Sequence, residues 1–251
     1  MTQQLPWLSE TDPFPPVETA WGEHDPLPGL LAAGGKLDAQ SLQAAYSQGI
    51  FPWFSAGQPI LWWSTDPRMV LQTTQFRLHH SLKKTIKKFR RTPGCEVRID
   101  TCFEQVMRHC AQTAREGQDG TWIVESIIAA YVQLHQQGLA HSVETWMDGQ
   151  LVGGLYCVAL GRAVFGESMF AHRTDASKIA LAALVALCHH HGAPQIDCQQ
   201  ATGHLASLGA QEIPRSEFLK VVAQQRALPP MHWQFDPVYW DYLLPNAPDA
   251  A

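Results

Sequence analysis

Asp197 and Gln199 have the residue types and the spacing from which a catalytic site could be built. They lie two apart in QIDCQ, a segment typical of a strand, so both side chains are expected on one face. Glu167, in GESMF near the end of an earlier predicted strand, could bring a second carboxylate close to them. An acid and an amide on one face, with a further carboxylate, can orient and deprotonate an amine nucleophile. The alternative is that Asp197 caps a turn and Gln199 satisfies backbone groups where the strand ends.

Signals for other chemistry are missing from the sequence. It contains no G-x-S-x-G nucleophile elbow, and GLLAAGG at 29–35 is neither a P-loop nor a dinucleotide fingerprint. The three histidines at 189–191 are consecutive, so on a helix they point in different directions and do not converge on a metal. The six cysteines form no C-x-x-C pair, which indicates reduced thiols rather than a zinc site. We therefore expect no metal and no cofactor.

An antiparallel meander must position the candidate residues. The turn signals Asp148-Gly149 and Gly161 separate three strand-like segments, at 142–146, 150–160 and 162–170. A helix over 176–190 follows, with Asp175 placed to cap it, and then the strand 195–199. Lys178 opens this helix, where a cation opposes the helix dipole, which suggests an anionic neighbour such as an RNA phosphate or Glu167.

The remaining elements complete an α+β architecture. The pattern predicts helices over 37–46, 102–114 and 123–136, the first capped by Asp38, and a strand over 69–72. Ser216 could cap a final helix, and the tail after Leu228 is expected to lie across the surface. We predict two domains: a small irregular N-terminal lobe over 1–70 and a larger α+β domain over 71–251.

An aromatic segment from Gly49 to Arg68 lies at the end of the N-terminal lobe. It holds five Phe and Trp residues, three of the nine tryptophans among them, around Gly57 and between three prolines. Because proline fixes φ and removes a hydrogen-bond donor, we expect neither a regular helix nor a central strand here. Two interpretations remain: a hydrophobic plug between the two lobes, or the wall of a pocket for an apolar group.

Charge is distributed unevenly along the 251 residues. The net charge of −5 argues against a nucleic-acid partner, yet nine of the eighteen Lys and Arg fall between Arg68 and Arg98 against one acid. Leu82, Ile86 and Phe89 have helical spacing, so the basic residues occupy the other faces of an amphipathic helix. Such a helix is either a solvated surface or a docking site for RNA phosphates. An apolar run of transmembrane length and a signal peptide are both missing, so we expect a cytoplasmic protein without a membrane partner.

Several longer blocks make the chain recognisable. GLLAAGG, GIFPWF, PILWWSTDPR, AHSVETW, LVGGLY, FGESMF, ASKIAL, IDCQ and HLASLGA occur in this order from about Gly29 to Arg215. Together they closely resemble the bacterial leucyl/phenylalanyl-tRNA–protein transferases. The resemblance implies an aminoacyltransferase that moves Leu or Phe, and less readily Met, from Leu-tRNA or Phe-tRNA to proteins with N-terminal Arg or Lys. The product would carry an N-degron, which directs the modified protein to degradation.

The resemblance also assigns roles to individual residues. It implies that Asp197 holds and polarises the acceptor amine, that Gln199 relays its proton, and that Glu167 pairs with the basic residue of the acceptor. The implied aminoacyl pocket is formed by Trp53, Trp122, Met169, Leu155 and Leu184, the last two standing where some relatives have Met and Phe. For the tRNA we predict contacts with the basic helix, through Lys83, Lys84, Lys87, Lys88, Arg90 and Arg91.

Two further functions fit parts of the sequence. The C-terminal domain of the family is similar to the GNAT acyltransferase fold, which agrees with the predicted order of meander, helix and strand. A small-molecule N-acyltransferase of GNAT type would need a glycine-rich loop for CoA before its central helix, and this place reads AHRTDASK, without glycine. A non-catalytic RNA- or peptide-binding module would need the basic helix but neither Asp197 nor Gln199. We expect a monomer.

Overall fold

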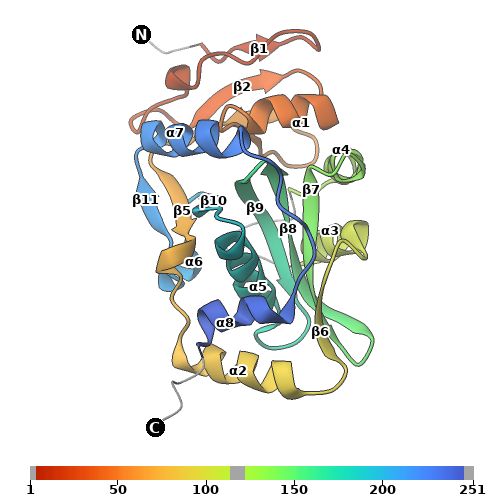
Figure 1. The fold of residues 1–251 in the computed structure, drawn as a ribbon. Helices are drawn as coiled ribbons and strands as arrows, with labels where there is room; N and C mark the ends of the chain where they lie inside the picture. Colours follow the sequence, from red (N-terminus) through yellow and green to blue (C-terminus); the bar gives the residue numbers. More distant parts are fainter. Residues whose placement is uncertain (1–3, 114–121, 246–251) are drawn as a thin grey trace.

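The computed structural model describes residues 4–113 and 122–245, which form two β-sheets with helices around them (Figure 1). The smaller sheet has the strand order β1-β2-β4-β3, and the larger sheet has the order β11-β5-β10-β9-β8-β7-β6. The strands of the smaller sheet are β1 (Trp7–Leu8), β2 (Leu30–Gly34), β3 (Phe51–Pro52) and β4 (Leu61–Trp63). Those of the larger sheet are β5 (Arg68–Gln72), β6 (Cys95–Ile99), β7 (Ala140–Met147), β8 (Gln150–Leu160), β9 (Ala163–Ala171), β10 (Gln195–Gln199) and β11 (Gln211–Ile213).

The helices confirm the predicted α+β class. They are α1 (Ala39–Tyr46), α2 (His80–Arg91), α3 (Phe103–Gln112), α4 (Glu125–Gln136), α5 (Ala176–His190), α6 (Gly203–Ser207), α7 (Arg215–Arg226) and α8 (Trp240–Leu243). Three single 3-10 turns accompany them: η1 (Val17–Thr19), η2 (Thr73–Gln75) and η3 (Pro237–Tyr239). No helix in the described part of the chain is long and apolar enough to cross a membrane.

The predicted meander, helix and following strand form the centre of the larger sheet. β7, β8 and β9 pair antiparallel, and β10 then pairs parallel with β9 and antiparallel with β5. Along β8 the side chains alternate between two hydrophobic clusters: Tyr156 and Val158 pack with α3 and α4, whereas Leu155 and Cys157 pack with α5. Because neighbouring strand residues point to opposite faces, the sheet is covered on both sides, which explains why β8 is apolar at almost every position.

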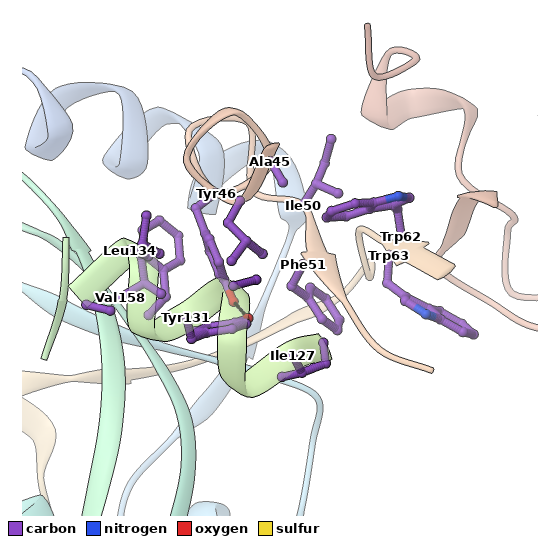
Figure 2. Packing of buried hydrophobic residues seen from close by; sticks show 14 of the residues in the cluster. Ala45, Tyr46, Ile50, Phe51, Trp62, Trp63, Ile127, Tyr131, Leu134 and Val158 are labelled. Carbon is purple, nitrogen blue, oxygen red and sulfur yellow. Dashed lines mark hydrogen bonds between the residues drawn. The ribbon is translucent and has the colours of Figure 1, made fainter. Parts of the chain in front are cut away.

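The aromatic segment folds differently from the expectation of a loop. It forms a hairpin in which β3 and β4 pair antiparallel, and β4 is an interior strand of the smaller sheet, between β2 and β3. The prediction of no central strand was wrong because the prolines lie outside β4: Pro52 is on the edge strand β3, where a missing N–H is tolerated. Trp62 and Trp63 of β4 are buried, so this half of the segment is part of the hydrophobic core (Figure 2).

Helix α1 brings a tyrosine from the N-terminal region to the larger domain. Asp38 caps it as predicted, accepting a hydrogen bond from the Ser41 N–H at 2.8 Å. Its last residue, Tyr46, is fully buried and packs edge-on against Tyr131 of α4. Figure 2 shows the two hydroxyl groups pointing toward one another. The chain passes from the smaller sheet to the larger sheet between β4 and β5. We propose that the domain boundary lies near residue 70.

Two expectations about capping were wrong, and the expectation about the tail was confirmed. Asp175 precedes α5, but its backbone is left-handed and, in the described structure, its side chain makes no capping hydrogen bond. The final helix α7 begins at Arg215, directly after Pro214, so that Ser216 lies inside it. The tail lies across the surface as expected, since most of its described residues are exposed or half-buried, and Trp240 and Leu244 anchor it in the same hydrophobic cluster as α5. Tail tryptophans supply the apolar area for this packing.

Candidate active site

A cavity of ≈ 680 Å³ lies where the aromatic hairpin, the meander, α5 and β10 meet. The sequence-predicted residues Glu167, Gln199 and the five aminoacyl-pocket residues all line it, although they come from separate parts of the chain. The lining residues are Phe51, Pro52, Trp53, Trp122, Leu155, Tyr156, Gly166, Glu167, Ser168, Met169, Leu181, Leu184, Ile196, Asp197, Cys198, Gln199, Gln200, Thr202, His204 and Leu205.

One side of the cavity is apolar. Trp122, Leu155 and Leu184 are buried residues that line it, together with the partly buried Trp53 and Met169. Trp53 is fixed from behind by Trp63, whose indole N–H donates to the Trp53 carbonyl at 2.7 Å and whose ring lies 5.3 Å from the Trp53 ring. A concave apolar surface of this kind suits a hydrophobic side chain.

The other side carries a carboxyl group held by three hydrogen bonds. The Glu167 carboxyl accepts from the Tyr46 hydroxyl at 2.6 Å, the Tyr131 hydroxyl at 3.3 Å and the Gln199 side-chain amide at 3.2 Å. The two tyrosine hydroxyl oxygens also lie within hydrogen-bond distance of each other (Figure 2), so their two protons are shared among three contacts. Four elements therefore converge on one carboxyl group: α1, α4, β9 and β10.

Burial raises the pKa of Glu167 to about 8, and the nearby Asp197 carboxylate acts in the same direction. The hydrogen bonds from Tyr46 and Tyr131 and the charge of Arg68 act against this shift. Burial also keeps both tyrosines protonated, since it raises the pKa of each well above its ordinary value. Glu167 can therefore gain or lose a proton close to neutral pH, while the tyrosines act as hydrogen-bond donors.

The Asp197 and Gln199 side chains do not lie side by side on one regular strand face. A register irregularity in β10 lies between the two residues, and Gln199 has a left-handed backbone with φ 56°, so regular strand alternation does not relate their side chains. The Asp197 side chain is fully buried, and both of its oxygens accept hydrogen bonds from Arg68, at 2.8 and 2.7 Å. Oδ1 also accepts from the backbone N–H of Gln199 at 2.9 Å.

Sequence reasoning did not single out Tyr46, Tyr131 or Arg68 as site residues. Each tyrosine resembles an ordinary core residue of a helix, and Arg68 counted as one of nine basic residues. The one available signal is that a buried tyrosine hydroxyl needs a hydrogen-bond partner, which a sequence does not identify. Because Arg68 is fully buried, it adds nothing to a basic surface.

No residue of the basic helix α2 lines the cavity, and α2 lies at the opposite end of the molecule from the smaller sheet (Figure 1). Its amphipathic pattern is confirmed, with Leu82, Ile86 and Phe89 buried. Of the predicted tRNA contacts, Lys83 is half-buried and Arg90 forms an ion pair with Asp241 at 3.2 Å. Lys84, Lys87, Lys88 and Arg91 are exposed.

Lys178 has a different anionic neighbour from those suggested. Its ammonium group donates to the Asp175 carboxylate at 3.0 Å, and the hydroxyl of Thr85 on α2 donates to the same carboxylate. The expectation that Glu167 is the partner of Lys178 was wrong, because the Lys178 ammonium group pairs with Asp175, three residues earlier in the chain. Asp175 thus serves Lys178 and α2 instead of capping α5.

Comparison with known proteins identifies the family. A family model described as leucyl/phenylalanyl-tRNA protein transferase matches residues 70–223, and a model of the N-terminal domain of this enzyme matches residues 35–66. The chain is 63% identical over 240 residues to a leucyl/phenylalanyl-tRNA–protein transferase of Albidiferax ferrireducens, covering 96% of this chain and 94% of that protein. It is 60% identical to the enzyme of the same name from a Polaromonas species, covering 97% and 96%.

Solved structures show weaker similarity. A GCN5-related N-acetyltransferase from Kribbella flavida gives a TM-score of 0.34 at 12% identity, over 68% of this chain and 59% of that chain. The sequence matches, in contrast, extend over nearly the whole chain and its relatives. The chain therefore belongs to the leucyl/phenylalanyl-tRNA protein transferase family of aminoacyltransferases.

Proposed function

We propose that the cavity binds the aminoacyl end of Leu-tRNA or Phe-tRNA and transfers the amino acid to the N-terminal α-amine of proteins that begin with Arg or Lys. One observation carries this proposal: a single cavity combines an apolar wall with a carboxyl group whose pKa is about 8. The apolar wall suits the side chain that is transferred, and the carboxyl group suits the amine that receives it. Methionine would be a poorer donor side chain.

The donor needs little activation. An aminoacyl ester is already an activated acyl group, so aminolysis requires correct placement of the amine and stabilisation of the tetrahedral intermediate. The pocket built from Trp53, Trp122, Leu155, Met169 and Leu184 would hold the aminoacyl side chain. An apolar pocket discriminates between similar hydrophobic groups by only about 1–3 kcal/mol for each methylene. Acceptance of more than one apolar amino acid follows from this weak discrimination.

The acceptor amine must lose a proton before or during attack. An α-amino group has a pKa of about 8, so a carboxyl group with a pKa of about 8 can exchange a proton with it at little cost in free energy. Gln199 donates its side-chain N–H to Glu167, which leaves its amide oxygen to accept a hydrogen bond from the amine. A cationic Arg or Lys side chain close to Glu167 would favour the ionised carboxylate and draw the acceptor into the site.

The tRNA body would contact the exposed basic side chains of α2. Phosphate binding by lysine and arginine depends on a local positive surface and weakens as salt rises. The exposed Lys84, Lys87, Lys88 and Arg91 supply most of this surface, with the half-buried Lys83 and the ion-paired Arg90 beside them, although the net charge of the chain is −5. We further propose that the enzyme acts as a cytoplasmic monomer, needs no cofactor or metal, and creates N-degrons on its protein substrates.

Labelled Leu-tRNA mixed with peptides that differ only in their first residue tests the proposal. We expect label in peptides that begin with Arg or Lys, much less in a peptide that begins with Ala, and none in an N-acetylated Arg peptide. Equal labelling of the acetylated peptide would contradict transfer to the α-amine. Retention of tRNA without any transfer would instead indicate a non-catalytic RNA-binding module.

A further inference from the structure

Arg68 is a fully buried arginine beside the proposed site. Its Nε and Nη2 donate to the two oxygens of Asp197, and its Nη1 donates to the Gly49 carbonyl at 3.1 Å. The rings of Phe51 and Phe218 lie against the guanidinium group, with their centroids 4.8 and 4.6 Å from its central carbon. Hydrogen bonds and aromatic faces thus fix one guanidinium group from several directions.

This arrangement joins four parts of the fold. Arg68 is on β5, Asp197 on β10 and Phe218 on α7, while Gly49 and Phe51 belong to the N-terminal region. A buried ion pair is expensive to desolvate, and its free energy is recovered only when the geometry is good and the remaining hydrogen bonds are made. A bidentate pair of guanidinium and carboxylate meets that condition and also fixes the orientation of both groups.

Asp197 transmits this fixed orientation to Gln199. The Oδ1 atom that accepts from Arg68 Nε also accepts the backbone N–H of Gln199. The Gln199 carbonyl is fixed as well, since it accepts from the Thr65 hydroxyl at 2.9 Å. With both backbone groups held, Gln199 keeps its left-handed conformation, which non-glycine residues rarely adopt, and directs its side-chain amide to Glu167.

We propose that Arg68 is a positioning residue for aminoacyl transfer. By occupying both oxygens of Asp197, Arg68 makes this carboxylate a clamp on the backbone of Gln199. Asp197 borders the cavity, but its side chain is fully buried, so it acts through Gln199. This inference rests on the proposed function, since it concerns the placement of the amide that receives the acceptor amine.

Single-turnover transfer from Phe-tRNA to an Arg-initiated peptide tests the inference. The variants are Arg68→Lys, which keeps the charge but loses the bidentate fork, Asp197→Asn, and the two together. We expect each single variant to lower the rate constant of transfer by about 10²-fold, as a misplaced catalytic group does, with the affinity for Phe-tRNA unchanged. Since the two residues act as one unit, the double variant should be no slower than the slower single variant.

The pH profile separates positioning from direct catalysis. With Arg68 acting through position, Arg68→Lys and Asp197→Asn should lower the rate at every pH and keep a titration, because Glu167 is intact. The midpoint of the profile should stay in place in Arg68→Lys, which keeps the positive charge, and should move to lower pH in Asp197→Asn, which loses a carboxylate that raises the pKa of Glu167. Arg98→Lys is a matched control: Arg98 also donates to a carboxylate, that of Glu96, and contacts an aromatic ring at 4.2 Å, but outside the cavity. It should transfer at the wild-type rate.

Three results would overturn the inference: wild-type rates in Arg68→Lys, multiplied losses in the double variant, or loss of the pH dependence in Asp197→Asn alone. If Arg68→Lys does not fold, Arg68→Met/Asp197→Leu removes both buried charges together, a change that often preserves folding. This variant should bind Phe-tRNA and transfer about 10²-fold more slowly, and a wild-type rate would equally overturn the inference. An inactive wild-type protein would refute the proposed function instead.

Discussion

Replacing Glu167 with glutamine should remove a specific pH dependence from the stability of the protein. The pKa of Glu167 is about 8 in the folded protein, whereas the unfolded chain should titrate near the ordinary value of 4.5. Between these two values the folded state keeps a proton that the unfolded state has released. The contribution of the protonated carboxyl is therefore complete below about pH 4.5 and is lost progressively as pH rises to about 8.

The size of the effect follows from these two pKa values. Each pH unit between them costs the wild-type protein about 1.4 kcal/mol, which amounts to roughly 3 kcal/mol by pH 7 and roughly 5 kcal/mol above pH 8. Glutamine at position 167 does not titrate, and its amide oxygen can still accept from the Tyr46 hydroxyl. Glu167→Gln should thus gain stability relative to wild type as pH rises.

Urea unfolding of both proteins, at about pH 5 and about pH 8.5, measures this difference. We expect the free energy of unfolding of Glu167→Gln, relative to wild type, to increase by several kcal/mol between the two conditions. Glu217→Gln, at an exposed position on α7, controls for the loss of a glutamate outside the cavity. A difference between Glu167→Gln and wild type that is the same at both pH values would refute the reasoning.

Three further predictions concern the groups around the site and the basic helix. Tyr46→Phe removes a hydrogen bond that lowers the pKa of Glu167, so the midpoint of the pH–rate profile should move to higher pH; an unchanged midpoint would separate Tyr46 from the titration. Gly49→Ala should cost about 2 kcal/mol in urea unfolding, because φ is 71° and a Cβ atom would lie 2.5 Å from Leu219, and unaltered stability would contradict this strain. Replacing the α2 lysines, Lys83, Lys84, Lys87 and Lys88, with glutamine should weaken tRNA binding. The slope of log affinity against log salt should fall by roughly 0.7–0.9 for each phosphate that is no longer neutralised. An unchanged slope would exclude α2 as the tRNA-binding surface.

Local signals predicted the central part of the fold well. The ranges 150–160, 176–190 and 195–199 agree with the observed bounds of β8, α5 and β10. Turn residues delimit the first of these, since Asp148-Gly149 and Gly161 both adopt positive φ. Such punctuation acts between neighbouring residues, which is why a sequence can reveal it.

The geometry of the candidate site could not be predicted in the same way. Arg68 and Asp197 are 129 residues apart, and Tyr46 and Tyr131 are 85 residues apart. Their contacts depend on how two sheets and several helices pack, not on any local pattern. The expectation that the side chains of Asp197 and Gln199 share one regular strand face was wrong, because β10 has a register irregularity between them. This irregularity accompanies a hydrogen bond from the Gln199 backbone N–H to the Asp197 carboxylate, which a sequence pattern does not reveal.

The aromatic segment combines both kinds of outcome. Its composition indicated a plug or a pocket wall, and the structure places Trp62 and Trp63 in the core while Trp53 lines the cavity. Phe51 has a further place that composition alone does not indicate, against the guanidinium group of Arg68. Its ring therefore borders both the cavity and the ion pair that we propose to hold Gln199.

The most direct test of the proposed function is to locate the residue that the enzyme adds. The wild-type protein is incubated with Leu-tRNA and a peptide that begins with Arg and carries an internal lysine, and the product is sequenced by tandem mass spectrometry. We predict a single leucyl residue joined through a peptide bond to the α-amine of the N-terminal arginine, and a strongly reduced yield with Gln199→Ala. An unmodified peptide, or leucine attached to the internal lysine, would contradict the account.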